Sequence, residues 1–196
     1  MAPLGATPLE CLHVITVHTI PDAFTPAECD VIVGIARDAE SQDARLVGLA
    51  KDHDIRRADL VWLDDVEGTD WVMNRIIDAV RVANREVFDF EIREFAESPQ
   101  VARYGAERKG HFDWHSDIGE GLLARQRKLT MVIQMSEPSD YTGGLLELMP
   151  SNSVIAADQR RGAVTFFPSY MLHRVTPVTS GERFSLTTWA HGPAFR

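Results

Sequence analysis

Residues 110–117 read Gly-His-Phe-Asp-Trp-His-Ser-Asp, and this stretch contains two histidine-x-aspartate pairs. The first pair is His111 with Asp113, and the second is His115 with Asp117. In a β-strand, side chains two residues apart point to the same face, so we expect both pairs on one face of the strand, and either pair could hold one metal ion. We favour the second pair, because we expect the strand to end at Asp117 and a glycine-containing loop to follow it. A bare pair of this kind is common by chance, and a strand histidine is more often a hydrogen-bonded core or surface residue.

The sequence around this stretch predicts a fold rich in β-strands. After residue 97, short segments of strand character are separated by turns that contain Gly and Pro, and no helical run interrupts them. This number and spacing of strands are typical of a two-sheet jelly roll (double-stranded β-helix) or of a barrel. The expected core strands, about eight, are Gln100–Tyr104, Gly110–Asp117, Arg127–Ser136, Leu145–Met149, Val154–Ala157, Ala163–Pro168, His173–Val178 and Arg183–His191.

The first 96 residues have a mixed character. Thr25, Pro26 and Glu28 form a strong helix start, with an N-cap, a proline in the first turn and an acid at the third position. We expect a strand over residues 11–19, a helix from Thr25 to Asp38, a strand over 59–63, a helix from Gly68–Asp70 to Val87 and a strand over 88–92. The whole chain then predicts an α+β protein with one domain, in which residues 1–96 support a catalytic core over 97–196.

Bulk properties exclude several classes of protein. The net charge of -9 argues against binding to nucleic acid or to anionic membranes, which both favour a basic surface. Cys11 and Cys29 are distant from the histidines along the chain and form no Cys-x-x-Cys motif, which favours a reducing cytosol. The N-terminus lacks a basic region followed by an apolar core, and no stretch is apolar enough to cross a bilayer. We therefore expect a cytoplasmic protein without a signal peptide; oligomeric state carries no signal in the sequence.

A distant histidine completes a candidate metal site. His173 lies in the stretch Pro-Ser-Tyr-Met-Leu-His-Arg-Val, residues 168–175. Together with His115 and Asp117 it would offer two imidazoles and one carboxylate, a set that suits Fe(II) with three open positions on one face. The same set also suits catalytic zinc, so a hydrolytic site is an alternative.

Arg183 indicates what else the site would bind. On a strand, Arg183, Ser185, Thr187 and Trp189 share one face. An arginine that points into a barrel is costly unless a carboxylate meets it, and its planar fork can bind such a group through two hydrogen bonds. No nearby acid is an obvious structural partner, which favours a cosubstrate that bears a carboxylate, with Ser185 as an added donor. A structural ion pair is the alternative.

The order and spacing of these motifs resemble the 2-oxoglutarate- and Fe(II)-dependent dioxygenases of the prolyl 4-hydroxylase-like group, and in particular the PKHD-type hydroxylases. The resemblance covers roughly residues 97–191. Its motifs are Arg103-Tyr104-Gly105, Phe112-x-x-His115-x-Asp117, Arg127-Lys128-Leu129-Thr130, Asp140-Tyr141-Thr142-Gly143-Gly144-Leu145, His173-Arg174-Val175-Thr176-Pro177-Val178, Gly181-Glu182-Arg183 and Trp189.

The resemblance implies roles for eight residues. His115, Asp117 and His173 would bind Fe(II), and Arg183 would bind the distal carboxylate of 2-oxoglutarate. Of the remaining four residues, Tyr104 would lie near the cosubstrate, and Gln134 falls where some relatives use a tyrosine against the same carboxylate. Thr130 shares a strand face with Gln134, and Ser185 shares one with Arg183, so both could also line the pocket. The family implies O2 as a further substrate, and ascorbate is a candidate addition. Two departures from the family pattern are Leu145, where an acid is frequent, and the charged run at residues 107–109.

The resemblance further implies hydroxylation of an unactivated C–H bond, since all three metal ligands are present and halogenases of this class lack the carboxylate. A prolyl residue in a protein or peptide is the first expected substrate, and a free amino acid or another small metabolite is the second. A jelly-roll binding module without oxygen chemistry is the alternative from another class. The candidate substrate wall consists of Arg56, Arg57, Trp62, Trp114, Tyr170 and Met171. Packing is the better explanation for each of them, and Arg56 and Arg57 could equally be surface charges.

Overall fold

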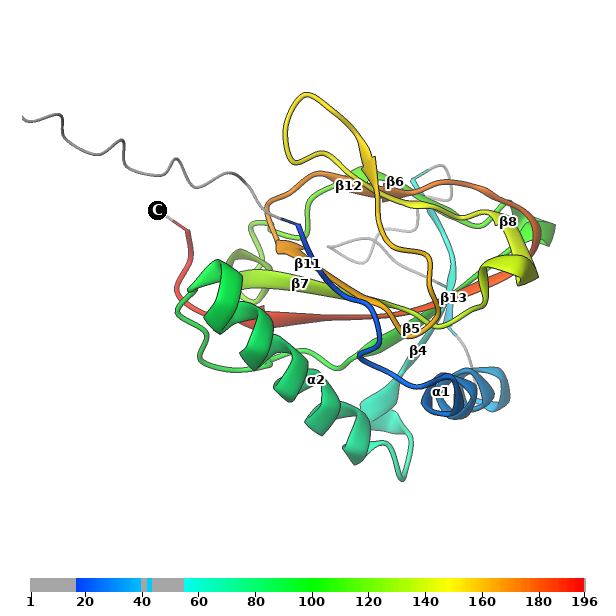
Figure 1. Cartoon of the computed structure of the whole chain (residues 1–196), viewed down its shortest axis with the longest axis horizontal. Coiled ribbons are helices and arrows are strands. Elements are labelled where there is room, and N and C mark those ends of the chain that lie inside the picture. The colour runs from blue at the N-terminus through cyan, green and yellow to red at the C-terminus, as the bar shows by residue number, and fades with distance from the viewer. Residues whose placement is uncertain (1–16, 40–41, 44–54, 196) are drawn as a thin grey trace, which may run out of the picture.

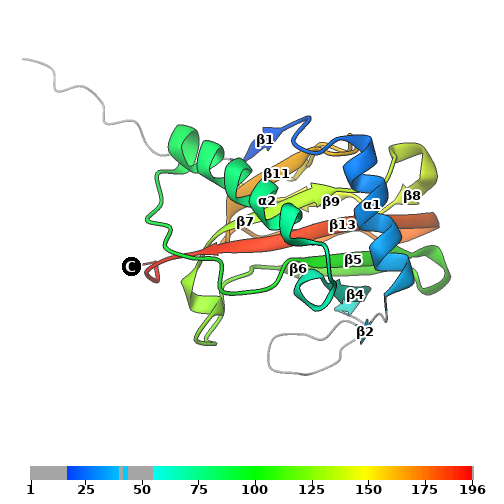
Figure 2. The ribbon, with the colours of Figure 1, turned by 90° about the horizontal axis from the view of Figure 1, so that it is seen from below.

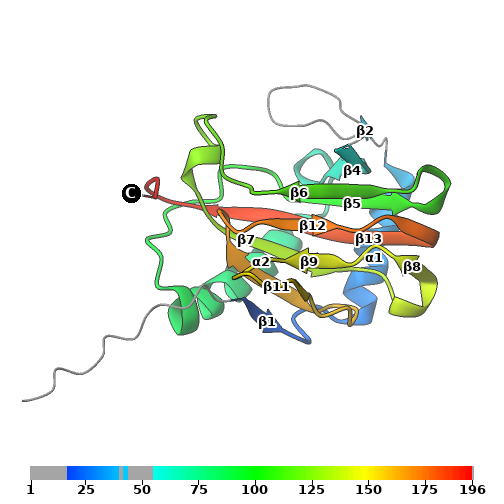
Figure 3. The ribbon, with the colours of Figure 1, turned by 90° about the horizontal axis from the view of Figure 1, so that it is seen from above.

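Two antiparallel β-sheets face each other in the computed structural model, which describes residues 17–39, 42–43 and 55–195. The larger sheet has the strand order β1-β11-β7-β13-β5-β4-β2, with β8 attached to β13, and the smaller sheet has the order β10-β9-β12-β6-β3. Helices α1 and α2 cover the outer face of the larger sheet (Figures 1 and 2). The smaller sheet closes the opposite side (Figure 3). This arrangement confirms the predicted jelly roll with supporting helices.

The elements have the following bounds. The strands are β1 (His18–Ile20), β2 (Gln42–Asp43), β3 (Arg56–Arg57), β4 (Asp59–Trp62), β5 (Gln100–Gly105), β6 (His111–His115), β7 (Arg127–Gln134), β8 (Tyr141–Gly143), β9 (Leu146–Leu148), β10 (Ile155–Ala156), β11 (Val164–Pro168), β12 (His173–Val175) and β13 (Val178–His191). The helices are α1 (Pro26–Asp38) and α2 (Asp70–Ala83), with a π-helical turn at Asn84–Phe88 and short 3-10 turns at Leu63–Asp65, Ala106–Arg108, Ala124–Gln126 and Pro138–Asp140.

Each of the eight predicted core strands corresponds to a strand of the structure, with differences at the ends. The largest difference concerns β13, which begins at Val178 and not at Arg183. Its first residues pair with β8, a strand absent from the prediction, in the register Val178 with Gly143 and Gly181 with Tyr141. The long β13 therefore pairs with β7, β5 and β8, and it forms the centre of the larger sheet.

The first 96 residues also contribute strands to both sheets. β1 pairs with β11 and β4 pairs with β5 in the larger sheet, while β3 pairs with β6 in the smaller one. The strand predicted over residues 11–19 overlaps β1, and residues 11–16 of that prediction lie outside the described part of the chain. β3 therefore lies directly beside the strand that carries His115.

Helix α1 begins as its sequence predicts. The Thr25 hydroxyl accepts a hydrogen bond from the Glu28 backbone N–H at 3.2 Å, and the Glu28 carboxylate accepts one from the Thr25 N–H at 2.7 Å. This reciprocal capping box satisfies two N–H groups that the first turn leaves without intrahelical partners. Both helices bury one apolar side against the larger sheet, through Cys29 and Ile32 in α1 and Val72, Ile76, Val80 and Ala83 in α2. Buried Cys29 is a free thiol, and burial raises its pKa to about 11, which keeps it protonated and unreactive.

The prediction of a strand over residues 88–92 is wrong. A π-helical turn extends α2 to Phe88, and Asp89 then takes a left-handed conformation with φ of 51°. The Asn84 side chain binds both backbone groups of Phe90, donating to its carbonyl and accepting from its N–H at 2.9 Å each. Because Asn84 satisfies the polar groups that a strand partner would bind, the alternating residues Phe88 to Ile92 pack without joining a sheet.

Two apolar clusters stabilise the fold. One fills the space between the helices and the larger sheet, and it includes Phe24, Ile76, Phe166 and Phe184. The other lies between the two sheets, and it includes Tyr104, Phe167, Leu148 and Val175. In the part of the chain that the structure describes, no helix is both long and apolar enough to cross a membrane.

Candidate metal centre

Three predicted ligands converge between the sheets at one end of the jelly roll. His115 ends β6, His173 begins β12, and the two residues are paired across these neighbouring strands. Asp117 lies two residues beyond β6, where its backbone N–H donates to the Ser169 carbonyl at 2.9 Å. One ligand atom from each residue lies within 4.8 Å of the others. The expectation that Asp117 belongs to the strand is wrong, because β6 ends at His115 and Asp117 is held instead by its backbone hydrogen bond to Ser169.

Hydrogen bonds fix the orientation of both imidazoles. His115 Nδ1 lies 2.7 Å from the Asp113 carbonyl, and His173 Nδ1 lies 2.9 Å from the Met171 carbonyl. A carbonyl can only accept, so each Nδ1 carries the proton and each Nε2 is free to bind a metal. Both Nε2 atoms face the Asp117 carboxylate, at 3.8 Å from His115 and 3.5 Å from His173.

The local electrostatics favour the ligand protonation states that a cation requires. Burial, followed by the charge of His173, lowers the pKa of His115 to about 4. Burial alone would raise the pKa of Asp117, but the neighbouring His173, His115 and Arg127 lower it below its usual value. At neutral pH the site therefore offers a neutral His115 imidazole and a carboxylate, as metal binding needs. Two nitrogen ligands and one oxygen ligand fit Fe(II), and within the described residues no second group of this kind occurs.

The competing pair, His111 and Asp113, does not join this site. An irregular register between β6 and β12 pairs His115 with His173 but Phe112 with Val175, so the alternation of the strand shifts by one residue. As a result Phe112 stacks on His115, with ring centroids 3.5 Å apart. The expectation that both histidine-x-aspartate pairs share a strand face is wrong because of this bulge.

Thr130 holds the metal-binding carboxylate. Its hydroxyl, fully buried on β7, donates to Asp117 Oδ2 at 2.7 Å and lies 3.0 Å from the Ser169 hydroxyl. Thr130 has a single proton, so Ser169 must be the donor in the second contact. The sequence assigned Thr130 to the cosubstrate, and that role stays a prediction, whereas the structure places its hydroxyl on Asp117. The partner Ser169 had no sequence signal, because the loop that carries it is distant along the chain.

Thr130→Val should lower metal affinity by about 10–100-fold, as loss of a hydrogen bond to a ligand typically does. The fold should be retained, since the two side chains have the same shape. A matched control is Thr188→Val, because Thr188 is equally buried and its hydroxyl has no partner in the described part of the chain. Isothermal titration with Fe(II) or Mn(II) measures the difference. Equal affinities in the two variants would contradict the positioning role of Thr130.

A second buried network supports the loop of Asp117. Arg127 donates to the Asp117 carbonyl at 3.0 Å, to Glu97 Oε2 at 2.6 Å and also to Glu97 Oε1. The Arg127 guanidinium lies over the Trp189 ring, 3.8 Å from its centre. Buried His191 accepts from the Ala96 N–H on one nitrogen and so donates to Glu97 at 2.9 Å with the other. The sequence did not predict this network, since most of its contacts join residues that are about 30 to 95 positions apart.

Glu97→Gln should destabilise the fold by roughly 2–4 kcal/mol at pH 7, since the buried Arg127 then loses its counter-charge. Burial would raise the pKa of Glu97, but the hydrogen bonds from Arg127 and His191 lower it to about 2. The stabilisation is therefore complete above pH 5 and is lost as the pH falls toward 2. Urea unfolding at several pH values should show the gap between wild type and variant closing in this window. A constant gap would contradict the ionic account.

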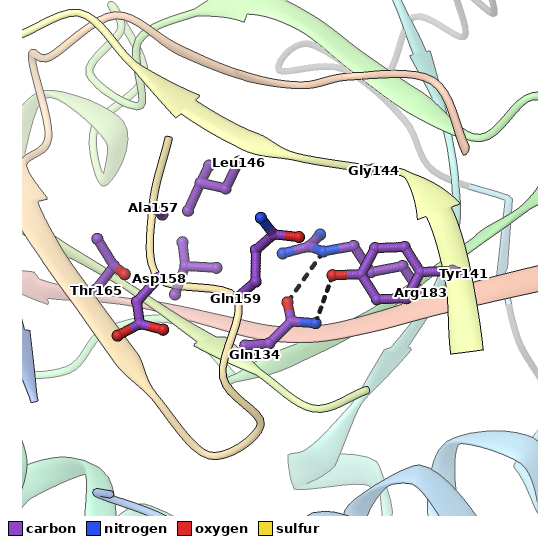
Figure 4. Close-up of a pocket in the computed structure, with 10 residues that line it drawn as sticks. Gln134, Tyr141, Gly144, Leu146, Ala157, Asp158, Gln159, Thr165 and Arg183 are labelled. Carbon is purple, nitrogen blue, oxygen red and sulfur yellow. Dashed lines mark hydrogen bonds between the residues drawn. The ribbon is translucent and has the colours of Figure 1, made fainter. Parts of the chain in front are cut away.

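Arg183 lies deep between the sheets with neutral partners. The side chain, 2% exposed, donates from Nε to Gln134 Oε1 at 3.1 Å, and Gln134 in turn donates to the Tyr141 hydroxyl at 2.9 Å (Figure 4). Gly144 adopts a φ of +60°, and a Cβ there would lie 3.0 Å from Arg183 Cδ. The absence of a side chain at Gly144 therefore leaves room for the arginine.

The other predicted cosubstrate residues lie around this arginine. Tyr104 faces Arg183 across β5 and β13, with the guanidinium carbon 5.7 Å from its ring centre. The Ser185 hydroxyl lies 3.4 Å from an Arg183 nitrogen. Among the described residues no carboxylate forms an ion pair with Arg183, so the structural ion pair considered above has no partner there.

A cavity of about 590 Å³ contains the metal ligands and reaches Tyr104 and Ser185 beside the arginine, whereas Arg183 and Gln134 themselves line a separate small pocket of about 10 Å³. The wall of the larger cavity includes Tyr104, Ser185 and all three ligands, as well as Arg56, Trp62 and Gln100. Of the residues considered as a substrate wall, Arg56 and Trp62 line the cavity, whereas Arg57, Trp114, Tyr170 and Met171 are not part of the wall. Trp114 instead lies against Arg174, and Tyr170 packs on Phe195.

Comparisons with known proteins agree with this geometry. A model of the 2OG-Fe(II) oxygenase superfamily matches residues 99–191. A PKHD-type hydroxylase of Hyphomonas neptunium is 38% identical over 72 residues, which are 37% of this chain and 32% of that protein. The chain spans between about a third and a half of the length of the curated relatives it matches.

Solved structures share the fold at low identity. A Pseudomonas putida prolyl-4-hydroxylase superimposes with a TM-score of 0.73 and 21% identity, over 92% of this chain and 95% of that one. A Trichoplax adhaerens prolyl hydroxylase, in complex with a hypoxia inducible factor peptide fragment, superimposes with a TM-score of 0.74 and 17% identity, over 89% and 83% of the two chains. Residues 99–191, which carry the three ligands and Arg183, thus match the 2OG-Fe(II) oxygenase superfamily, as the sequence motifs predicted.

Proposed function

We propose that this protein is an Fe(II)- and 2-oxoglutarate-dependent hydroxylase. One observation supports this proposal above all. The same jelly roll holds two histidines and a carboxylate with free ligand atoms, and also a buried arginine without a carboxylate partner among the described residues. A hydrolytic zinc site or a simple metal-binding module needs the first feature but not the second.

The side chains of the chain would divide the work as follows. His115, Asp117 and His173 would hold Fe(II) through two imidazole nitrogens and one carboxylate oxygen. Arg183 pairs with the distal carboxylate of 2-oxoglutarate, which orients the keto acid toward the metal. When bound, Fe(II) and 2-oxoglutarate supply the oxygen chemistry, in which O2 and 2-oxoglutarate are consumed, succinate and CO2 are released, and a substrate C–H becomes C–OH.

Two further features would support the cosubstrate. Gln134 accepts from Arg183 Nε and Ser185 accepts from one outer nitrogen, so the remaining N–H groups of the guanidinium are left for the carboxylate. Tyr104 and Ser185 lie beside the arginine and offer hydroxyl donors. The apolar residues of the cavity wall, Leu60, Val132 and Leu146, exclude water from the reacting groups.

The relatives indicate only a broad class of substrate. Because the neighbours named above are prolyl hydroxylases, we propose a prolyl group as the unit that is hydroxylated. A free amino acid or another small metabolite is the second candidate, and the charge of Arg56 in the cavity wall favours it.

The test is conversion of 2-oxoglutarate to succinate by the purified protein. The proposal predicts that turnover needs both Fe(II) and O2, that it stops when a chelator removes the metal, and that Zn(II) does not restore it. Hydrolytic activity restored by Zn(II) would contradict it, as would metal and 2-oxoglutarate binding without any turnover.

A further inference from the structure

Two buried N–H groups in the cavity wall lack a hydrogen-bond acceptor among the described residues. These groups are Arg56 Nε and Trp189 Nε1, and both residues line the cavity that contains the metal ligands. Buried polar groups in native structures nearly always have a partner. Two such donors in one wall therefore indicate a ligand that accepts hydrogen bonds there.

Arg56 also carries a charge that no carboxylate neutralises in the described part of the chain. Its guanidinium donates to the neutral Gln100 side chain at 3.3 Å and lies over the Phe112 ring, 4.5 Å from the ring centre. The other arginine of the wall, Arg127, differs because Glu97 accepts two hydrogen bonds from it. A partly buried guanidinium without a counter-charge is costly, so this position favours an anionic ligand.

The position of Arg56 brings this charge close to the metal centre. Phe112, on which the guanidinium lies, stacks in turn on His115 with ring centroids 3.5 Å apart. β3 pairs directly with β6, in the register Arg56 with Phe112. The arginine is therefore fixed beside the strand that carries a metal ligand.

The site of Arg56 is separate from the cosubstrate arginine. Arg56 binds Gln100, which pairs with Thr187, whereas Arg183 pairs with Tyr104. Gln100 and Tyr104 are four residues apart on β5, which corresponds to about 13 Å along an extended strand. One 2-oxoglutarate molecule that binds Arg183 and the metal would thus leave Arg56 for another ligand.

We propose that Arg56, with Trp189 Nε1 as a second donor, binds a carboxylate of the primary substrate. The substrate would then be a small carboxylic acid, such as a free amino or imino acid, or a C-terminal residue. A residue inside a peptide chain presents only uncharged carbonyls near the reacting carbon and would leave Arg56 without a counter-charge. The proposal rests on the proposed function, because it takes the cavity beside the metal as the substrate site.

Matched acids and amides test this proposal by binding alone. The protein is loaded with Zn(II) and saturated with N-oxalylglycine, which occupies the cosubstrate site. Saturation-transfer NMR then compares L-proline with L-prolinamide, N-acetyl-L-proline with N-acetyl-L-prolinamide, and a panel of other amino acids with their amides. We expect the acid of at least one pair to bind about tenfold more tightly than its amide, because a charge-assisted hydrogen bond is roughly twice as strong as a neutral one.

Two neighbouring arginines provide the matched variants. Arg56→Met keeps a long unbranched side chain beside Phe112 and removes the charge, so the preference for the acid should disappear. Arg57→Met is the control, because Arg57 lies on the same strand but outside the cavity wall and donates to the Arg108 carbonyl. Arg56→Lys should restore part of the preference, since it keeps the charge but loses Nε. The proposal is overturned if no acid binds better than its amide, or if the preference persists in Arg56→Met.

One additional measurement, the anaerobic absorption band, distinguishes failure of this proposal from failure of the proposed function. The Arg56→Met protein should still bind Fe(II) and 2-oxoglutarate and should still show their anaerobic absorption band. If the wild-type protein shows the band but binds no acid more tightly than its amide, the role of Arg56 is overturned and the proposed function remains intact. Absence of the band in the wild-type protein would overturn the proposed function itself.

Discussion

Asp117→Ala is expected to abolish 2-oxoglutarate turnover and to lower Fe(II) affinity by more than about 100-fold. Loss of a group that only supports a ligand typically costs 10–100-fold, and loss of the ligand itself should cost more. The remaining His115 and His173 would hold the metal through two neutral nitrogens, without the charge that a divalent cation favours. Turnover is measured as succinate formed, and metal affinity by titration.

Asp113→Ala is the matched control for this variant. Asp113 belongs to the first histidine-x-aspartate pair, is exposed, and accepts a hydrogen bond from the Trp114 N–H. This variant should bind Fe(II) and turn over 2-oxoglutarate as the wild-type protein does. Full turnover with normal iron content in Asp117→Ala would show that the ligand assignment is wrong.

Arg183→Leu is expected to raise the KM for 2-oxoglutarate by about 100-fold or more, with Fe(II) affinity nearly unchanged. Loss of one partner from a buried, hydrogen-bonded charge pair costs roughly 2–5 kcal/mol. Arg183→Lys should have a smaller effect, because lysine keeps the charge but cannot bind a carboxylate through a planar fork. Steady-state kinetics over a wide range of 2-oxoglutarate concentrations measures both variants.

Stability distinguishes this role from a structural one. If Arg183 formed a buried ion pair within the protein, its removal should cost roughly 3–5 kcal/mol of unfolding free energy. Because no carboxylate pairs with it among the described residues, Arg183→Leu should unfold at a denaturant concentration close to that of the wild type. Arg174→Leu is the control for kinetics, since Arg174 pairs with Glu147 away from the cavity wall and should leave the KM unchanged. A large loss of stability with a normal KM would contradict the cosubstrate role.

Local pattern was sufficient to predict most of the fold. The alternation of apolar residues and the Gly and Pro turns after residue 97 predicted the eight core strands, and the capping box at Thr25 predicted the start of α1. The π-helical turn after α2 was missed, because the Asn84 side chain overrides the alternation of Phe88 to Ile92. Strand β8 was missed because its pairing depends on β13, which follows about 40 residues later.

The residues of the candidate site could be predicted from the sequence, but their arrangement in space could be predicted only in part. The ligands His115, Asp117 and His173 have motif spacing that the sequence shows directly. The bulge that turns Phe112 toward His115 depends on pairing between β6 and β12, which no local pattern records. The same holds for Ser169 and Glu97, since their contacts with Thr130 and Arg127 join segments brought together only by the fold.

The central claim is that Fe(II) and 2-oxoglutarate bind together at His115, Asp117, His173 and Arg183. The most direct measurement adds both to the protein without oxygen and records the visible spectrum, where a chelate of the keto acid on Fe(II) gives a weak charge-transfer band. We predict that the wild-type protein shows the band, that Asp117→Ala lacks it, and that Arg183→Leu shows it only at much higher 2-oxoglutarate concentrations. A wild-type protein that binds Fe(II) but shows no band with saturating 2-oxoglutarate would contradict the account.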